Sequence, residues 1–177
     1  MEQKNTGDQR CWVLAALDRY EIRLLRFAVR LLSDEDVARD AVQHAFLRLC
    51  GQSAERLDGR EGPWLFTVCR HYVIDVLRKR ENAPAEDIAT ADCCDREPDP
   101  ADAAEQADLH RCINRLVDRL PVAQREAVLF WSEGFSYRQI AEMTDASEGN
   151  VRVIVHRAFK QLRQHPAVQK VFALTLQ

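Results

Sequence analysis

Glycine, proline and aromatic residues are all scarce in this chain, and their scarcity limits its fold. The 177 residues include 6 glycines, 6 prolines and 7% aromatic residues, whereas 46% of the residues are hydrophobic. Glycine and proline are the residues least compatible with a helix interior, so low numbers of both favour a helical protein. The length suits one domain or two small ones, and the apolar content supports packed cores. We therefore expect an all-α fold.

Membrane spans, secretion signals and enzyme motifs are also missing. No apolar run approaches the ~20 residues that cross a bilayer, and residues 1–10 are polar and lack the apolar core of a signal peptide. The sequence has no nucleophile elbow, glycine-rich phosphate loop, H-E-x-x-H motif or paired catalytic carboxylates, and its five histidines are scattered. We expect a cytoplasmic protein that is not an enzyme, uses no cofactor and does not insert into the membrane.

The six cysteines include no C-x-x-C pair, the spacing common in zinc and redox sites. Three of them fall within amphipathic patterns, namely Cys11, Cys50 and Cys69. We expect these three to be small buried side chains. Cys93 and Cys94 with His110 and Cys112 are a conceivable metal or redox site, but adjacent cysteines in an acidic stretch are a poor tetrahedral template. We expect no metal site.

Charge is distributed unevenly, although the net charge is only −3. Residues 1–80 carry a net charge of +2 and residues 109–177 carry +4, whereas residues 81–108 carry −9 and three of the six prolines. The acidic segment has too few large apolar residues to form a core, so we expect a flexible linker. The sequence therefore predicts two small helical domains, 1–80 and 109–177, on an acidic tether, a charge asymmetry that hints at nucleic-acid binding.

Three amphipathic helices are predicted in the first domain. We expect them over residues 11–32, from a Ser33 cap to about residue 50, and over residues 64–80 with Pro63 at the first helical position. Residues 51–62 are a polar loop between the last two. The first core stripe is expected to comprise Val13, Leu14, Leu17, Leu24, Ala28, Leu31 and Leu32. The second is expected to comprise Ala38, Ala41, Val42, Ala45, Phe46 and Leu49.

Residues 136–163 read as a helix-turn-helix with a basic second helix. Ser136 followed by Gln139 is a capping signature, residues 144–146 supply a turn, and Ser147 caps the longer helix that Pro166 bounds. Two further helices are expected over 109–120 and 121–133. The buried stripe of the longer helix is expected to be Val151, Val155, Ala158 and Leu162. A second helix of this kind can enter a DNA major groove, although a plain helical hairpin gives the same pattern.

Three blocks of the sequence resemble the bacterial extracytoplasmic-function (ECF) sigma factors, the smallest RNA polymerase specificity subunits. Residues 34–49 (DEDVARDAVQHAFLRL) resemble the family's core-polymerase-binding helix. Residues 62–80 (GPWLFTVCRHYVIDVLRKR) resemble the segment that reads and melts the −10 element, and residues 120–163 resemble the −35-reading domain. The resemblance spans about residues 15–163, and three blocks in this order are highly specific. It implies a transcription initiation subunit without catalysis of its own.

The resemblance also implies partners and roles. An acid, a glutamine and a phenylalanine recur in the polymerase-binding helix, and they correspond to Asp40, Gln43 and Phe46. Spacing alone favours a solvated face for the first two and a core position for Phe46. The family implies docking on core RNA polymerase, promoter DNA as ligand, and an anti-sigma protein that holds the factor inactive. From the residues alone, a stand-alone helix-turn-helix regulator that does not need the Asp40 face remains the alternative.

For the −10 element, the family's loop before the melting helix holds a flipped base, which places this base within residues 52–61. Trp64 and Phe66 offer faces for stacking on unpaired bases, but Trp64, next to Pro63 at the start of an apolar helix, is more typical of a core anchor. The better candidates for the melted strand are cations and a histidine of the loop and helix, namely Arg56, Arg60, Arg70, His71, Arg78, Lys79 and Arg80. The family usually has Asn at the position of His71.

For the −35 element, Ser147 and Asn150 are expected to meet phosphates near the helix start. Arg152 and His156 are expected at base edges. Phosphate contacts are expected from Arg157, Lys160 and Arg163, with internal pairing to an acid as the alternative for Arg157. The family usually has Thr at the position of Asn150 and Ser-Arg at Val153-Ile154, so relatives do not reveal the promoter sequence. The linker is either a solvated spacer or, as the family implies, a segment that threads the polymerase's nucleic-acid channel.

Overall fold

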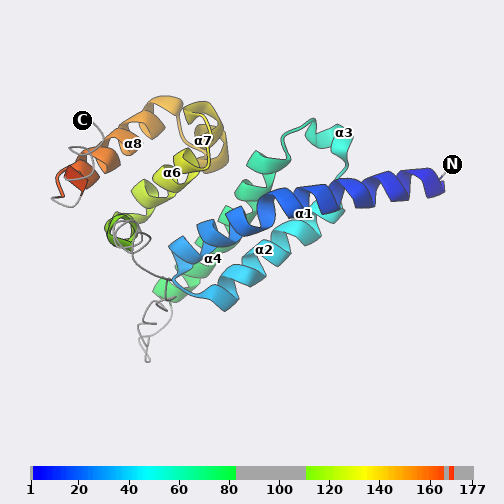
Figure 1. Cartoon of the computed structure of the whole chain (residues 1–177), viewed down its shortest axis with the longest axis horizontal. Coiled ribbons are helices and arrows are strands. Elements are labelled where there is room, and N and C mark those ends of the chain that lie inside the picture. Colours follow the sequence, from blue (N-terminus) through cyan, green and yellow to red (C-terminus); the bar gives the residue numbers. More distant parts are fainter. Residues whose placement is uncertain (1, 83–110, 166–167, 170–177) are drawn as a thin grey trace, which may run out of the picture. The chain divides into compact units, whose positions relative to one another are not determined.

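The chain forms two compact helical units. The structure, a computed structural model, describes residues 2–82, 111–165 and 168–169, and every regular element in these ranges is a helix (Figure 1). One unit contains the helices of residues 2–82, and the other contains those that follow residue 110. No helix in the described ranges combines the length and the apolarity needed to cross a membrane. Most of the predicted linker, with Cys93, Cys94 and His110, lies outside the described residues.

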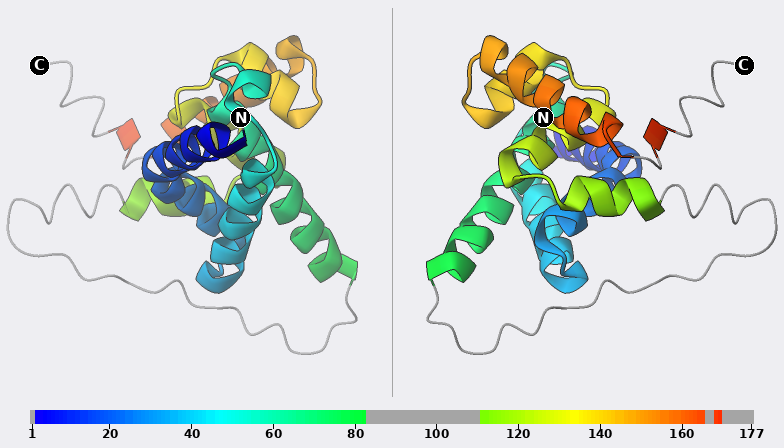
Figure 2. Two further views of the ribbon diagram at one scale, coloured as in Figure 1. Left: turned by 90° about the vertical axis from the view of Figure 1, so that its right-hand side faces the viewer. Right: turned by 90° about the vertical axis from the view of Figure 1, so that its left-hand side faces the viewer.

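The N-terminal unit contains four helices: α1 (Glu2–Leu32), α2 (Glu35–Cys50), α3 (Ala54–Leu57) and α4 (Glu61–Asn82). The three long helices, α1, α2 and α4, pack against one another, as Figures 1 and 2 show. Phe27 of α1 meets Phe66 of α4 edge-on, with ring centroids 5.5 Å apart, and both side chains are fully buried. These two rings are central to the core of the first unit, because aromatic side chains bury more apolar area than other residues.

The predicted position of α2 is confirmed, but its cap is one residue later than expected. Asp34, not Ser33, is the N-cap, and its carboxylate accepts a hydrogen bond from Val37 N–H at 3.1 Å. Ser33 instead has φ of 53° and makes the turn between α1 and α2. All six residues expected in the core on α2 are buried. A carboxylate satisfies the first backbone donors as well as a hydroxyl does, which explains why the sequence pattern allowed either cap.

The prediction for α1 was wrong at its N-terminal end. The helix begins at Glu2 instead of residue 11, and Leu14 is 62% exposed although we expected it in the core. Val13 and Leu17 are only partly buried, whereas Ala16 and Phe27 are buried. Figure 1 shows the N-terminal turns of α1 extending beyond α2. Ala16 faces the other helices, whereas Leu14 lies on a different side of α1 and stays exposed.

Two of the three cysteines expected in the core are exposed. Cys11 and Cys50 lie at the surface of α1 and of the last turn of α2, and only Cys69 is buried. Burial raises the pKa of the Cys69 thiol to about 12, because a thiolate would be poorly solvated there. Cys69 therefore acts as a small apolar side chain of α4, as the sequence predicted.

The segment before α4 is more ordered than the polar loop that we expected. It contains the single turn α3, whose cap is Ser53 and whose residue Leu57 is buried. α4 begins at Glu61, so Pro63 lies within its first turn and not at its first position. Proline is tolerated there because the first-turn N–H groups have no partner within the helix.

The C-terminal unit contains a helical segment at residues 111–118 and three further helices, α6 (Val122–Ser132), α7 (Tyr137–Thr144) and α8 (Glu148–Arg163). α6 packs on α8, and Trp131 meets Phe159 edge-on with ring centroids 4.9 Å apart. The predicted buried stripe of α8 is confirmed in full. The core beneath it also contains Val117, Leu120 and Val128.

Candidate nucleic-acid interfaces

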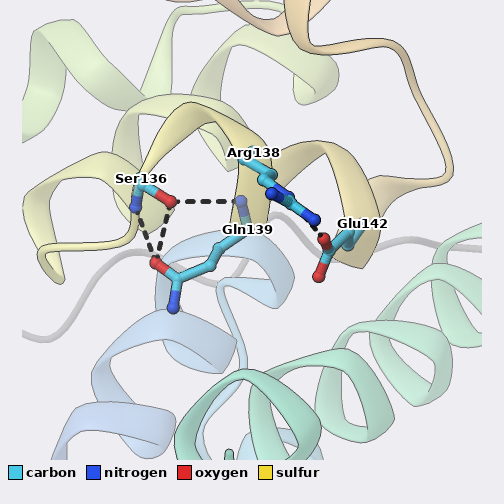
Figure 3. Close-up of polar contacts among 4 residues, drawn as sticks. All are labelled: Ser136, Arg138, Gln139 and Glu142. Atoms are coloured by element: carbon cyan, nitrogen blue, oxygen red, sulfur yellow. Dashed lines mark hydrogen bonds and ion pairs between the residues drawn. The ribbon is translucent and has the colours of Figure 1, made fainter.

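The starts of α7 and α8 have the capping hydrogen bonds that the sequence predicted. Ser136 Oγ accepts a bond from Gln139 N–H at 3.2 Å, and Gln139 Oε1 accepts one from Ser136 N–H at 2.9 Å (Figure 3). Asp145, with φ of 55°, makes the turn after α7. Ser147 Oγ then accepts from Asn150 N–H at 3.2 Å and caps α8. The start of both helices is fixed by local sequence, so α8 has a defined direction within its unit.

The predicted DNA-contacting residues of α8 are all exposed. They lie outside the buried stripe, which leaves them accessible to a partner. Arg152, His156 and Lys160 follow one another at four-residue spacing and so share a side of the helix. The exposed set comprises Ser147, Asn150, Arg152, His156, Arg157 and Lys160.

Arg152 of α8 has two described neighbours that hold its guanidinium in place. Its guanidinium lies 3.1 Å from Glu148 Oε1, one helical turn earlier, and 5.6 Å from the centre of the Tyr137 ring of α7. The side chain is still 65% exposed. No described acid lies within ion-pair distance of Arg157, so the structure gives no support to the internal pairing considered for it. An arginine braced by an acid and a ring is preorganised for a directional contact.

In the N-terminal unit the predicted cations lie in different environments. Arg56 and Arg60 are exposed on either side of the turn that joins α3 to α4. On α4, Arg70 is partly buried. The remaining candidates of α4 that are fully exposed are His71, Arg78 and Lys79. This unit therefore displays its cations over a loop and a helix, and not along one helix alone.

Arg80 has an intramolecular role. Its guanidinium donates to the Leu32 carbonyl oxygen at 3.0 Å and to Asp34 Oδ2 at 2.8 Å. It thereby ties the end of α4 to the turn between α1 and α2. The hydrogen bond from Val37 N–H, and after it the Arg80 guanidinium, lower the pKa of the Asp34 carboxyl. Sequence reasoning missed this contact because the two residues are 46 positions apart.

The aromatic residues of α4 are core residues to different extents. Phe66 is completely buried against Phe27, so its faces are unavailable for stacking on bases. Trp64 is half-buried at the start of the helix. Phe66 is therefore a core residue, whereas Trp64, for which we favoured a core position, is only partly buried.

A stripe of exposed side chains runs along α2, and we call it the α2 stripe. Its members are spaced three or four residues apart, which places them on one side of the helix. Sequence reasoning identified Asp40 and Gln43 but missed Leu47, which is 66% exposed. Phe46 is only 8% exposed and packs in the core. The α2 stripe comprises Asp36, Asp40, Gln43 and Leu47. The signal for Leu47 was available, because it lies outside the buried stripe.

Comparison with known proteins shows that both units match regions of one protein family. Residues 16–83 match the sigma-70 region 2 family, and residues 110–162 match the sigma-70 region 4 family. The ECF RNA polymerase sigma factor SigL of Mycobacterium tuberculosis is 30% identical, over 84% of this chain and 85% of the relative. This chain belongs to the ECF RNA polymerase sigma factor family. It is an alternative sigma factor, and the expectation drawn from its three sequence blocks is confirmed.

Other relatives agree with this assignment. SigX of Bacillus subtilis, also an ECF sigma factor, is 28% identical over 84% of this chain and 80% of the relative. The matches to several other curated relatives cover only 33%, 56% or 58% of the relative's length. A solved structure of the sigma factor RpoE from Bartonella quintana, in complex with the anti-sigma factor NepR, matches with a TM-score of 0.60 at 24% identity. The match covers 89% of this chain and 95% of that one, and it shows a shared fold.

The two family matches correspond closely to the two units. The region 2 match begins within α1 and ends next to the last residue of α4, and the region 4 match runs from the 111–118 segment to the end of α8. Sigma-70 proteins are regulatory subunits, which agrees with the absence of catalytic motifs from the sequence. The N-terminal turns of α1 precede the region 2 match.

Proposed function

We propose that this sigma factor reads the −35 element of its promoters with the exposed face of α8. The observation that carries the proposal is the line of Arg152, His156 and Lys160 on a helix whose other side is buried. A helix of this kind fits the major groove, where arginine binds guanine edges in a bidentate manner. Arg152, braced by Glu148, is our candidate for such a contact, and His156 lies one turn further on.

Phosphate contacts would position α8 in the groove. Ser147 and Asn150 lie at its start, where backbone N–H groups also favour anions. Arg157 and Lys160 are exposed cations further along. Such contacts supply affinity that falls with added salt and carry little sequence information.

We propose that the N-terminal unit binds the melted −10 element with the loop before α4 and with α4 itself. Arg56 and Arg60 would hold the displaced strand near the loop. Extruding a base costs a few kcal/mol of stacking, so a loop that accepts the flipped base makes opening selective for sequence. On α4 the accessible contacts are Arg70, His71, Arg78 and Lys79. Arg80 would contribute by holding the end of α4 against the α1–α2 turn, and not by contacting DNA.

We propose that the α2 stripe docks on the coiled coil of the largest polymerase subunit. Two acids, an amide and an exposed leucine lie on one side of the helix, and an exposed apolar side chain beside polar ones is a feature of protein interfaces. Asp40 and Gln43 would set the register, and Leu47 would supply the buried contact. Phe46 would act indirectly, by anchoring α2 in the core.

The proposal extends to domain roles and partners. Residues 1–80 would bind polymerase and the −10 element, residues 109–177 would bind the −35 element, and residues 81–108 would tether them. The protein would act where polymerase and chromosome lie, in the cytoplasm. An anti-sigma protein is a natural partner, because the solved relative from Bartonella quintana is bound to one.

Run-off transcription with core polymerase and a genomic promoter library tests the proposal. Transcripts that start only when the chain is present and share two spaced upstream motifs are expected. Asp40→Ala with Leu47→Ala should reduce core binding, whereas Arg39→Ala, which removes an exposed α2 residue outside the stripe, should not. No starts, combined with tight binding of duplex DNA by the free chain, would overturn the proposal in favour of a stand-alone regulator.

A further inference from the structure

The polar N-terminal turns of α1 contact the loop to which we assign −10 recognition. Gln9 Nε2 donates to the Gln52 carbonyl oxygen at 2.6 Å, and Trp12 Nε1 donates to Glu61 Oε1 at 3.0 Å. Gln52 and Glu61 are the first and last residues of the segment 52–61. Two adjacent turns of α1 therefore form hydrogen bonds to both ends of this loop.

The loop between these contacts has a defined shape. Ser53 caps α3, Leu57 is buried, and Asp58 and Gly59 follow with φ of 47° and 73°. Two successive residues in the left-handed region are uncommon outside tight turns, because this region is restricted for residues with a side chain. The buried leucine and this turn leave Arg56 and Arg60 exposed on either side.

A close approach of α4 to α1 supports the same end of the loop. A Cβ atom on Gly62 would lie 3.0 Å from Tyr20 Oη and 3.1 Å from two ring carbons. Only glycine fits there without a shift of the ring. The ring itself is flanked by Arg19 and Arg23, each with its guanidinium carbon 5.4 Å from the ring centre. The first turn of α4 is therefore seated directly on α1.

We propose that Gln9 and Trp12 are positioning residues for −10 recognition: they hold segment 52–61 in the shape that captures melted DNA. The inference rests on the function proposed above for this loop. Neither side chain needs to touch DNA. Their contribution is to lower the entropy that the loop would otherwise lose when it closes on a base, which is how preorganisation raises affinity.

The test uses the full-length chain, core polymerase and the strongest promoter found in the run-off screen. Trp12→Phe keeps a ring but removes the N–H donor, and Gln9→Ala removes the other bond. Cys11→Ser is the matched control, because Cys11 is exposed in the same turns. Each variant is measured for core binding, for run-off from the duplex promoter, and for run-off from the same promoter with a pre-melted −10 bubble.

We expect the Gln9→Ala, Trp12→Phe double variant to lose about 5–10-fold in run-off from the duplex, since each hydrogen bond contributes modestly. Core binding should stay unchanged, the pre-melted template should restore most of the activity, and preference at −10 bases should weaken. Full duplex activity of the double variant would overturn the inference. So would a parallel loss of core binding and of run-off from both templates, because that result means a general loss of structure.

A parallel Arg56→Ala, Arg60→Ala variant separates this inference from the proposed function of the loop. If the arginine variant loses promoter opening and the Gln9, Trp12 variant does not, the loop assignment stands and the positioning role is wrong. If the arginine variant opens the promoter normally, the loop assignment itself fails, and the positioning role fails with it.

Discussion

The two units present their candidate DNA-binding cations in different ways. In the C-terminal unit, Arg152, Arg157 and Lys160 project from one rigid helix and are exposed. In the N-terminal unit, several arginines help to build the fold: Arg80 binds the α1–α2 turn, and Arg23 lies over the rings of Tyr20 and Phe66. The exposed cations there are divided between a loop and α4. A duplex offers a regular groove that one helix can fill, whereas a melted strand has no fixed shape and calls for contacts from several elements.

The largest expected effect tests whether the two units are independent. Phe66→Ala should lower the free energy of unfolding of the N-terminal unit by about 3–5 kcal/mol, because it leaves a cavity beside Phe27. Hydrogen exchange of the full chain should show faster exchange in α1, α2 and α4, with α6 and α8 unchanged.

Phe130→Ala is the matched control for the other unit, because Phe130 is fully buried and meets Phe135 edge-on. It should give the opposite pattern of exchange. If either substitution speeds hydrogen exchange equally in both units, the units unfold together and are not independent.

The next largest effect is expected at α8, which we propose binds the −35 duplex. Arg152→Ala should cost about 1–3 kcal/mol in binding of the polymerase holoenzyme to the promoter and relax sequence preference at one −35 position. Glu148→Gln should weaken the brace on Arg152 and give a smaller change in the same direction. Binding to a panel of −35 point variants measures both.

Arg157→Ala is the control for Arg152, as a cation on the same helix with no described ion-pair partner. It should weaken binding to every member of the panel by a similar factor. An Arg152 variant that loses affinity uniformly would show that this residue contacts phosphate and not base edges.

Local signals explain which parts of the fold the sequence predicted. The Ser136–Gln139 capping pair, the Ser147 cap and the buried stripes of α2 and α8 follow from residues within one or two helical turns, and the structure confirms all of them. The class, all-α in two units, follows from the same periodicity.

The errors lie where tertiary contacts decide. The start of α1 is polar and has no apolar period, so the sequence did not predict a helix there. In the structure, Gln9 and Trp12 form hydrogen bonds to residues about 40 to 50 positions away. Leu14 fits a core stripe but lies on an exposed side of α1. Among the site residues, Arg80 resembles its neighbours Arg78 and Lys79 in the sequence, so its contacts with Leu32 and Asp34 could not be predicted.

A smaller effect is expected at the tie between α4 and the α1–α2 turn. Asp34→Ala removes the α2 cap and the Arg80 partner, and should cost about 1 kcal/mol of stability. Because the folded-state pKa of Asp34 lies below its ordinary value of 3.8, its stabilising effect is present above that value and is lost as pH falls through the lower folded pKa.

Urea unfolding of the wild type and Asp34→Ala between pH 3 and 7 checks this prediction. The difference between them should be constant at neutral pH and should shrink only at the acid end. Asp36→Ala, which lacks the Arg80 contact, is the control. A difference that does not change down to the acid limit would mean that cap geometry, and not charge, stabilises the turn.

The smallest expected effect is on the salt dependence of DNA binding, which differs between phosphate contacts to a duplex and to a single strand. Neutralising one phosphate contact to duplex DNA lowers the slope of log affinity against log salt by about 0.9, whereas one contact to a single strand lowers it by about 0.7. Lys160→Ala on α8 and Lys79→Ala on α4 are a matched pair of exposed lysines. With holoenzyme and a promoter carrying a pre-melted −10 bubble, both slopes should fall, and the α8 variant should show the larger change. If only Lys160→Ala alters the slope, the end of α4 lies away from the DNA, and the melted strand is then held by the loop that carries Arg56 and Arg60.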